Sequence, residues 1–139
     1  MVRLEVVAQK VAAAQARLAA ADPLFSRPRE EFLATDKDRD VAMFYLFLAI
    51  QECIDLAAHW VVDEEWGPPE DAGDSFDILR DKSVLDADLA RALRSATGLR
   101  NRIGHGYGFL DPGRTHDEYP EGSKALRRFL SIVADAAGI

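Results

Sequence analysis

The chain has 139 residues, a length that suits one domain, so residues 1–139 are expected to form a single unit. With 48% hydrophobic and 29% charged residues, the composition is that of a globular protein and excludes a disordered or fibrous one. The net charge of −7 excludes a general polyanion binder, so any contact with nucleic acid must use a local basic patch. The single cysteine, Cys53, excludes an internal disulfide framework and fits a reducing cytosol.

No targeting or membrane-spanning segment is predicted. The N-terminal stretch 1–21 carries Glu5, Lys10 and Arg17 at intervals and has no unbroken apolar segment. The longest apolar run, 41–50, is far shorter than the roughly 20 residues that a membrane span needs. We therefore expect a cytoplasmic protein that makes no contact with a membrane.

The first helix is predicted over residues 2–21. Its apolar residues recur at three- and four-residue steps, at Leu4, Val7, Val11, Ala14 and Leu18. Asp22-Pro23 is expected to end this helix, because proline disfavours helical backbone in the residue before it. Residues 22–34 are then expected to form a connector with room for a short helical turn.

A second helix is predicted over residues 36–62, with Thr35 and Asp38 as a capping pair. Apolar residues cover nearly its whole circumference, which is typical of a helix packed between neighbours, so we expect it at the centre of the fold. Residues 64–74 contain Gly67-Pro68-Pro69 and are expected to form an exposed loop.

Two further helices are predicted over 76–82 and from Ser83 or Asp86 to about Ile103. The glycines 104, 106 and 108 are expected to end the second of these helices. Asp111-Pro112-Gly113 is predicted to be a turn, and the last helix is predicted to begin near Pro120. The predicted fold class is therefore all-α, an up-and-down bundle of four or five helices.

No metal site is predicted. The acidic run 36–40 is similar to the start of a calcium loop, but Val41 stands where that loop needs glycine and Phe47 where it needs its last glutamate. His116 is expected in a polar loop, where nothing pairs it with a second ligand. Cys53 is expected to be a small core residue.

The segment 98–108, with the sequence GLRNRIGHGYG, concentrates the residues that carry chemistry. At about 100° per residue, Arg100 falls within about 40° of Leu93 and Ala96, so it lies in the apolar stripe of its helix. An unpaired guanidinium is costly to bury, and Arg100 therefore needs a carboxylate, a phosphate or a wet groove. The structural alternative is a buried salt bridge to Asp40 or Asp55 of the second helix.

His105 by itself would more often be a helix-end residue bonded to backbone. In an unbroken helix Arg100 and His105 would point about 140° apart and could not easily share a substrate. A joint role therefore requires either that the helix end near Gly104 or that a second subunit supply part of the site.

The segment contains the motif R-x4-H-x-Y, in which Arg100 is followed after four residues by His105 and after one more residue by Tyr107. In this motif the chain resembles the HepT toxins of the HEPN superfamily of helical ribonucleases. Further segments follow the pattern of the family, at 39–40, 49–57, 73–79 and 99–102, so the resemblance covers roughly residues 36–133. It implies a HEPN-like helical bundle that forms a homodimer, or a higher oligomer, with the motif helices of both subunits facing a shared cleft.

The resemblance also implies an activity, that of a toxin in a toxin–antitoxin pair which cuts RNA as an endoribonuclease without a metal or other cofactor. His105 would act as general base or acid for attack by a ribose 2′-hydroxyl on the adjacent phosphate, since imidazole can take up or release a proton near neutral pH. Arg100 would hold the scissile phosphate, and Asn101 would orient the site by hydrogen bonding. Part of the local positive surface for RNA would come from Arg91, Arg94 and Arg102.

The family further implies a regulatory partner. An antitoxin of the MntA kind, a minimal nucleotidyltransferase, transfers AMP from ATP onto the tyrosine of the motif, and Tyr107 stands at that position. A bulky anionic group there would block the cleft and repel RNA, although an amphipathic tyrosine at a helix end is the commoner explanation of such a residue. Two alternatives stay open: a non-catalytic helical adaptor that binds a nucleotidyltransferase, and a structural dimerisation bundle with Arg100 salt-bridged internally.

Overall fold

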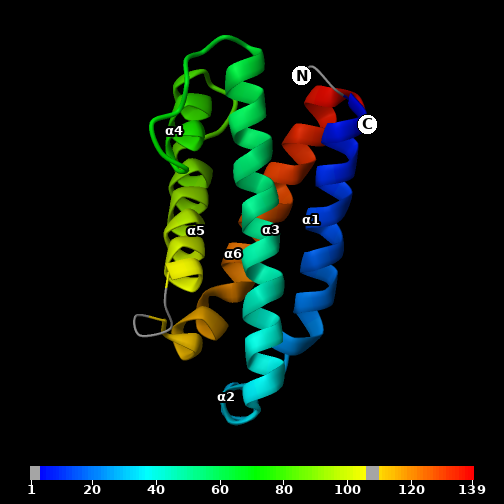
Figure 1. Ribbon diagram of the computed structural model, residues 1–139, viewed down its shortest axis with the longest axis vertical. Coiled ribbons are helices and arrows are strands. Elements are labelled where there is room, and N and C mark those ends of the chain that lie inside the picture. Colours follow the sequence, from blue (N-terminus) through cyan, green and yellow to red (C-terminus); the bar gives the residue numbers. More distant parts are fainter. Residues whose placement is uncertain (1–3, 106–109) are drawn as a thin grey trace.

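The computed structural model describes residues 4–105 and 110–139, and this part of the chain contains six helices and no strand (Figure 1). The helices are α1 Leu4–Phe25, α2 Arg29–Ala34, α3 Asp36–Asp63, α4 Asp74–Asp81, α5 Ala87–His105 and α6 Pro112–Ala137. The four long helices lie side by side, and the short α2 and α4 occupy opposite ends of the bundle. The all-α fold class is confirmed, with α2 as a sixth helix within the expected connector.

Helix α3 is the central element, as predicted from its apolar circumference. It packs against each of the other five helices and buries large side chains that include Leu46, Ile50 and Leu56. By length and composition α3 could cross a membrane, but half of its most apolar stretch is buried inside the bundle, as in the core helix of a helical protein. Two large hydrophobic side chains of α3 remain exposed, Phe44 at 55% and Val62 at 60%.

The prediction that α1 ends at Asp22-Pro23 is wrong, because α1 continues to Phe25 with Pro23 exposed inside its last turn. Phe25 is buried and stacks on Tyr119, with 4.0 Å between the ring centroids. The Asp22 carboxylate accepts hydrogen bonds from Tyr119 Oη at 2.6 Å and from Arg127 Nη2 at 2.5 Å. These tertiary contacts hold residues 22–25 in a helical conformation that the local sequence disfavours.

The predicted start of the last helix near Pro120 is also wrong, since α6 begins eight residues earlier, at Pro112. Asp111 is the N-cap, and its Oδ1 accepts a hydrogen bond from the Arg114 amide at 3.1 Å. Pro112 occupies the first helical position, where its missing N–H costs nothing. Residues 111–113 are therefore a helix start and not a free turn, and His116 lies inside α6 and not in a loop.

The helix that carries the motif, α5, ends at His105, two residues beyond the predicted end near Ile103, so that Gly104 lies within its last turn. A Cβ atom added at Gly104 would lie 3.3 Å from the Phe47 ring on α3. A glycine at this position therefore allows α5 to lie close against α3. The prediction for Gly106 and Gly108 concerns residues outside the described part of the chain.

One hydrophobic core extends through the bundle, and its largest fully buried side chains come from three helices: Phe32 of α2, Phe76 of α4 and Phe129 of α6. Phe76 and Phe129 meet edge to face with 5.4 Å between ring centroids, which fixes α4 against α6. The core also holds Cys53, as predicted, and burial raises the pKa of its thiol. A thiol kept protonated in this way is a poor nucleophile.

Candidate functional site

Arg100 lies in the stripe of α5 that faces the bundle, as the helical wheel predicted. The buried side chains before it in this stripe are Leu93 and Thr97, and Arg100 itself is half-buried. Its Nε atom is buried and has no hydrogen-bond partner. Such an arrangement is costly, because a buried polar group that loses water without gaining a partner carries its full desolvation penalty.

The alternative of an internal salt bridge for Arg100 is wrong. Asp40 lies 3.6 Å from Arg39, and Asp55 accepts from Gln51 at 2.9 Å and pairs with Lys10 at 3.3 Å. Neither carboxylate is paired with Arg100, and no ion pair links it to any other residue between 4 and 105 or between 110 and 139. The guanidinium is therefore available for an anionic group from outside the protomer.

The two other predicted catalytic residues, Asn101 and His105, are exposed on α5. His105 is the last residue of the helix, and five helical residues separate its direction from that of Arg100 by about 140°. Within one protomer the two side chains therefore do not converge. Tyr107, the predicted modification site, lies outside the described residues.

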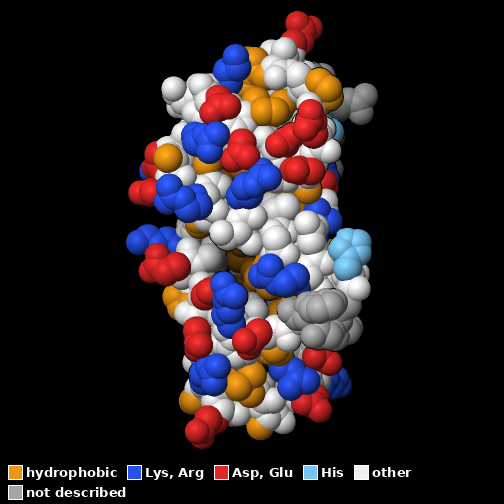
Figure 2. Space-filling model, turned by 90° about the vertical axis from the view of Figure 1, so that its left-hand side faces the viewer, with side chains coloured by type: hydrophobic (Ala, Val, Ile, Leu, Met, Phe, Trp, Pro, Cys, Tyr) orange, Lys and Arg blue, Asp and Glu red, His pale blue; other side chains and the backbone are white. Residues whose placement is uncertain are grey.

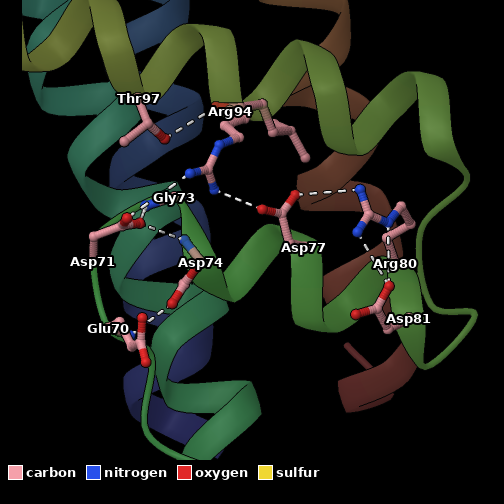
Figure 3. A network of polar contacts seen from close by, with 10 residues as sticks. Glu70, Asp71, Gly73, Asp74, Asp77, Arg80, Asp81, Arg94 and Thr97 are labelled. Atoms are coloured by element: carbon pink, nitrogen blue, oxygen red, sulfur yellow. Dashed lines mark hydrogen bonds and ion pairs between the residues drawn. The ribbon is translucent and has the colours of Figure 1, made fainter.

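Arg94 and Arg91, which were predicted to bind RNA, are both engaged with carboxylates. Arg94 donates to Asp77 Oδ2 at 2.6 Å, and its Nη2 lies 3.8 Å from Asp71 Oδ2 (Figure 3). It thereby joins α5 to α4 and to the preceding loop. Arg91 pairs with the neighbouring Asp88 at 3.0 Å, an exposed contact that contributes little to stability.

Arg102, the third arginine predicted to bind RNA, lines a groove of about 580 Å³ between α5 and α6, with Leu46 and Ile50 of α3 also lining it. Figure 2 shows a hollow on this side of the molecule, with hydrophobic side chains in its floor and both basic and acidic side chains around it. Arg102 has no carboxylate partner among the described residues. We refer to this feature as the α5–α6 groove.

Sequence reasoning missed the contribution of α6 to this surface. Arg114 and Lys124 also line the α5–α6 groove, together with Glu118, to which Arg114 donates at 3.0 Å. The signal that could have found Arg114 is the pair Asp111-Pro112, because an N-cap followed by proline marks a helix start and would have placed Arg114 on a helix. No local signal relates Lys124 to Arg102, since only the packing of α6 on α5 brings them to one groove.

Tyr119 forms part of the groove wall and connects it to α1. Burial, the hydrogen bond to Asp22 and the negative charge of Asp22 raise the pKa of the Tyr119 phenol. Burial by itself would raise the pKa of Asp22, but the hydrogen bonds from Arg127 and Tyr119 outweigh it and hold that pKa below its ordinary value. Tyr119 is therefore a fixed, neutral hydrogen-bond donor and not an acid–base group of the site.

The remaining histidines have other environments. His116 is half-buried, its Nε2 lies 2.7 Å from the carbonyl oxygen of Arg27, and its ring lies 5.0 Å from that of Phe32. His59 is exposed on α3, on an element remote in sequence from the motif. Within residues 4–105 and 110–139 no group of three or more His, Cys, Asp and Glu side chains is arranged to hold a metal ion.

Comparison with curated proteins identifies two relatives that are named as ribonucleases. The chain is 29% identical over 94 residues to a protein of Archaeoglobus fulgidus provisionally named an RNase, an alignment that covers 67% of this chain and 70% of that protein. It is 30% identical over 69 residues to the mRNA nuclease HepT of Shewanella oneidensis. The second alignment covers 50% of this chain and spans only about half, 52%, of that relative.

Solved structures share the whole fold. The tri-AMPylated HEPN toxin of Shewanella oneidensis, in complex with its MNT antitoxin, matches with a TM-score of 0.87 and 20% identity over 97% of this chain and 99% of that one. A toxin–antitoxin complex crystallised with AMP-PNP matches with a TM-score of 0.87 and 19% identity over 94% of this chain and 98% of that one. At these identities the likeness establishes the fold.

The family itself is shown by a match along most of the chain. The model of the family described as Ribonuclease HepT-like matches residues 15–133, which include Arg100, Asn101 and His105. This range contains α3, α4 and α5 whole and most of α6. The chain therefore belongs to the HepT-like ribonuclease family.

Proposed function

We propose that this chain is the toxin of a toxin–antitoxin pair, an endoribonuclease that cleaves RNA without a metal ion. The observation that carries the proposal is Arg100, a half-buried cation on the motif helix whose Nε is buried without a partner. A phosphodiester would satisfy it, because guanidinium binds phosphate through charge-assisted and often paired hydrogen bonds. Membership of the HepT-like ribonuclease family supports RNA as the source of that phosphate.

The proposed chemistry needs one proton acceptor, one proton donor and a cation. His105 takes the proton from a ribose 2′-hydroxyl, whose oxygen then bonds to the adjacent phosphorus while the bond from phosphorus to the 5′-oxygen breaks. The leaving 5′-oxygen takes a proton from solvent water, which gives a 2′,3′-cyclic phosphate and a 5′-hydroxyl end. Arg100 stabilises the charge that develops on the phosphoryl oxygens, and Asn101 orients the phosphate by hydrogen bonding.

We further propose that two protomers build one cleft, because Arg100 and His105 diverge by about 140° on a single α5. Phe44 is 55% exposed on α3, and Phe47, one turn along, lies against Gly104 of α5. Burial of this exposed ring in a second copy would remove apolar surface from water, so we take Phe44 as the contact between protomers. In such a homodimer His105 of one protomer can approach Arg100 of the other.

The catalytic proposal is tested with the purified chain and RNA in the presence of EDTA. Wild type should cleave, and His105→Ala should lose at least about a hundredfold in rate, the usual contribution of a general acid or base. His59→Ala, a change of another exposed histidine, is the matched control and should cleave at the wild-type rate. Undiminished cleavage by His105→Ala would remove His105 from the mechanism, and loss of cleavage in EDTA would remove metal independence.

The dimer is tested by light scattering at micromolar concentration. Wild type should have twice the mass of one chain, and Phe44→Glu should shift the protein towards the monomer and reduce cleavage, because it places a charge in the proposed contact. Val62→Glu, a change of the other exposed large residue of α3, should leave the mass at the dimer value. A wild-type monomer that cleaves RNA would contradict the shared cleft.

For regulation we propose that a nucleotidyltransferase antitoxin of the MntA kind transfers AMP to Tyr107. The phenol oxygen would attack the α-phosphorus of ATP and release pyrophosphate, and the added phosphate would repel RNA near His105. Incubation with the partner and ATP should add mass in steps of one adenylyl group and abolish cleavage. Tyr107→Phe should gain no mass, whereas Tyr45→Phe, as control, should be modified like wild type.

The divergence of Arg100 and His105 within one protomer favours a second candidate function, a non-catalytic helical adaptor that binds a nucleotidyltransferase. Induced expression of the chain alone discriminates between the two. A toxin should arrest growth and an adaptor should be harmless. Arrest that disappears with His105→Ala but persists with His59→Ala would exclude the adaptor.

A further inference from the structure

Small residues on both helices contribute to the lining of the α5–α6 groove. Gly98 on α5 and Gly122 on α6 line it, and neither has a side chain to fill the space between the helices. A Cβ atom added at Gly122 would meet no heavy atom within 4 Å. The hollow is thus built into the two helices and does not depend on the arrangement of a loop.

The groove has an aliphatic lining and an excess of cations at its edge. Leu46, Ile50 and Leu99 supply apolar surface. Among its charged residues, Arg102 and Lys124 come from opposite walls and have no ion-pair partner within the described part of the chain. The other charged residues are Arg114, which is paired with Glu118, and Glu121. On a chain with a net charge of −7, this local excess of one positive charge favours an anionic ligand.

We propose that the α5–α6 groove binds one nucleotide of single-stranded RNA next to the cleaved bond, with its base against the aliphatic lining and its phosphate between Arg102 and Lys124. This inference rests on the proposed function and adds to it a binding site outside the motif. On the same helix Arg102 lies three residues before His105 and about 60° from it in direction, whereas Arg100 points about 160° away from Arg102. A strand held at Arg102 therefore continues towards His105.

The size of the groove favours a nucleotide over a protein segment. Its volume of about 580 Å³ lies within the range of about 300–1,000 Å³ that is usual for small-ligand sites. A stable protein–protein interface needs about 800 Å² from each partner and an apolar centre, whereas here cations flank a compact hollow. A base can bind to such a lining without sequence-specific contacts, because every base has an apolar face.

The test fills the groove without changing its charges. Gly122→Leu places a side chain into the empty space, and Gly122→Ala is the matched control with a much smaller one. Both are made together with His105→Ala, so that a short single-stranded RNA is bound and not cleaved, and affinity is measured by fluorescence anisotropy. Gly122→Leu should bind about tenfold more weakly, the equivalent of one lost base contact, and Gly122→Ala should bind within about twofold of the parent.

A second pair of variants tests the charges. Arg102→Gln and Lys124→Gln should each flatten the slope of log affinity against log salt, and the double variant should flatten it by about 0.7, the value for one phosphate contact with a single strand. Arg128→Gln is the control, since Arg128 lies on α6 outside the groove and is paired with Asp86 at 2.8 Å. A denaturation curve will show whether Gly122→Leu folds. If it does not, the two charge variants still test the groove.

The outcomes separate this inference from the proposed function. Unchanged RNA affinity in Gly122→Leu, or unchanged salt slopes, would overturn the proposal that the groove binds RNA. Cleavage by wild type would still support the proposed nuclease activity. Failure of wild type to cleave would overturn the nuclease, whereas binding in the His105→Ala background would still report on the groove. Loss of the nucleotidyltransferase partner, or of the dimer, from Gly122→Leu with RNA affinity retained would identify a protein contact and overturn the proposal.

Discussion

At the scale of single residues, Arg100 shows a conflict between stability and the proposed function. Its Nε is buried without a hydrogen bond, and the carboxylates that could have neutralised it are paired elsewhere. A fold selected only for stability would place an apolar side chain in this position of the α5 stripe. The cost of Arg100 is understandable if an anion from outside the protomer binds it during function.

Replacement of this residue should therefore stabilise the fold and impair the activity. Arg100→Met is expected to raise the free energy of unfolding by about 1 kcal/mol, because methionine fills a similar volume without a buried, unpaired polar atom. RNA cleavage should fall at the same time. Urea denaturation and a cleavage assay measure the two effects, and Arg17→Met, at an exposed position of α1, should change neither by much. A large loss of stability in Arg100→Met would show a structural partner for Arg100.

At the scale of elements, proline and glycine lie within helices, although both residues usually interrupt or end a helix. Pro23 and Pro120 both lie inside helices, and Gly104 continues α5 instead of ending it. For Pro23 and Gly104 the reason is tertiary contact: Phe25 packs on Tyr119 beyond Pro23, and Phe47 packs on Gly104. The start of α6 was predictable, since Asp111 and Pro112 form a cap and a first helical residue.

The N-cap of α6 offers a test of this assignment. Asp111→Ala should lower the free energy of unfolding by about 1 kcal/mol, because the Arg114 amide loses the carboxylate that caps it. Asp135→Ala, a change of an exposed aspartate in the last turns of the same helix, should have little effect. Equal free energies of unfolding for the two variants in urea denaturation would contradict the capping role of Asp111.

At the scale of the whole molecule, a polar cluster joins the first and last helices. Asp22 of α1 accepts from Tyr119 and Arg127 of α6, while Phe25 stacks on the Tyr119 ring. The residues are almost a hundred positions apart in sequence, so their contact fixes how the two ends of the chain pack. It also supports the groove, because Tyr119 forms part of the groove wall.

The shifted pKa of Asp22 predicts how stability depends on pH. Because the folded-state pKa lies below the unfolded value of about 3.9, the contribution of the carboxylate is present above that pH and is lost as the pH falls through the folded-state pKa. Asp22→Asn should therefore be about 1 kcal/mol less stable than wild type at pH 7, a modest value for a partly exposed group. The difference should shrink as denaturation is repeated at decreasing pH below 4.

The raised pKa of Tyr119 predicts a loss of stability at high pH. Its contribution is present below the unfolded value of about 10 and is lost as the pH rises through the folded-state pKa. Wild type should therefore lose more stability between pH 9 and pH 11 than Tyr119→Phe, which has no phenol to ionise. Parallel curves for the two proteins in urea denaturation would contradict a buried, bonded phenol.

The sequence by itself determined the helical class, the central position of α3 and the place of Arg100 in the buried stripe of α5. These features follow from periodicity, which records burial directly, since each helix must turn its apolar side chains to the core. It also carried the motif from which the HepT-like resemblance follows, because the motif is a local pattern of residue types.

Only the tertiary structure decided which arginines are paired with carboxylates and which border the groove without such a pair within the described part of the chain. Arg91, Arg94 and Arg102 are alike in the sequence, but Arg94 is neutralised by Asp77 and Asp71 while Arg102 borders the groove. Likewise, only packing brings Lys124 of α6 to the same groove as Arg102 of α5. The physical reason is that charge pairing and cavities depend on distances between elements, and these distances have no counterpart in the local pattern of one helix.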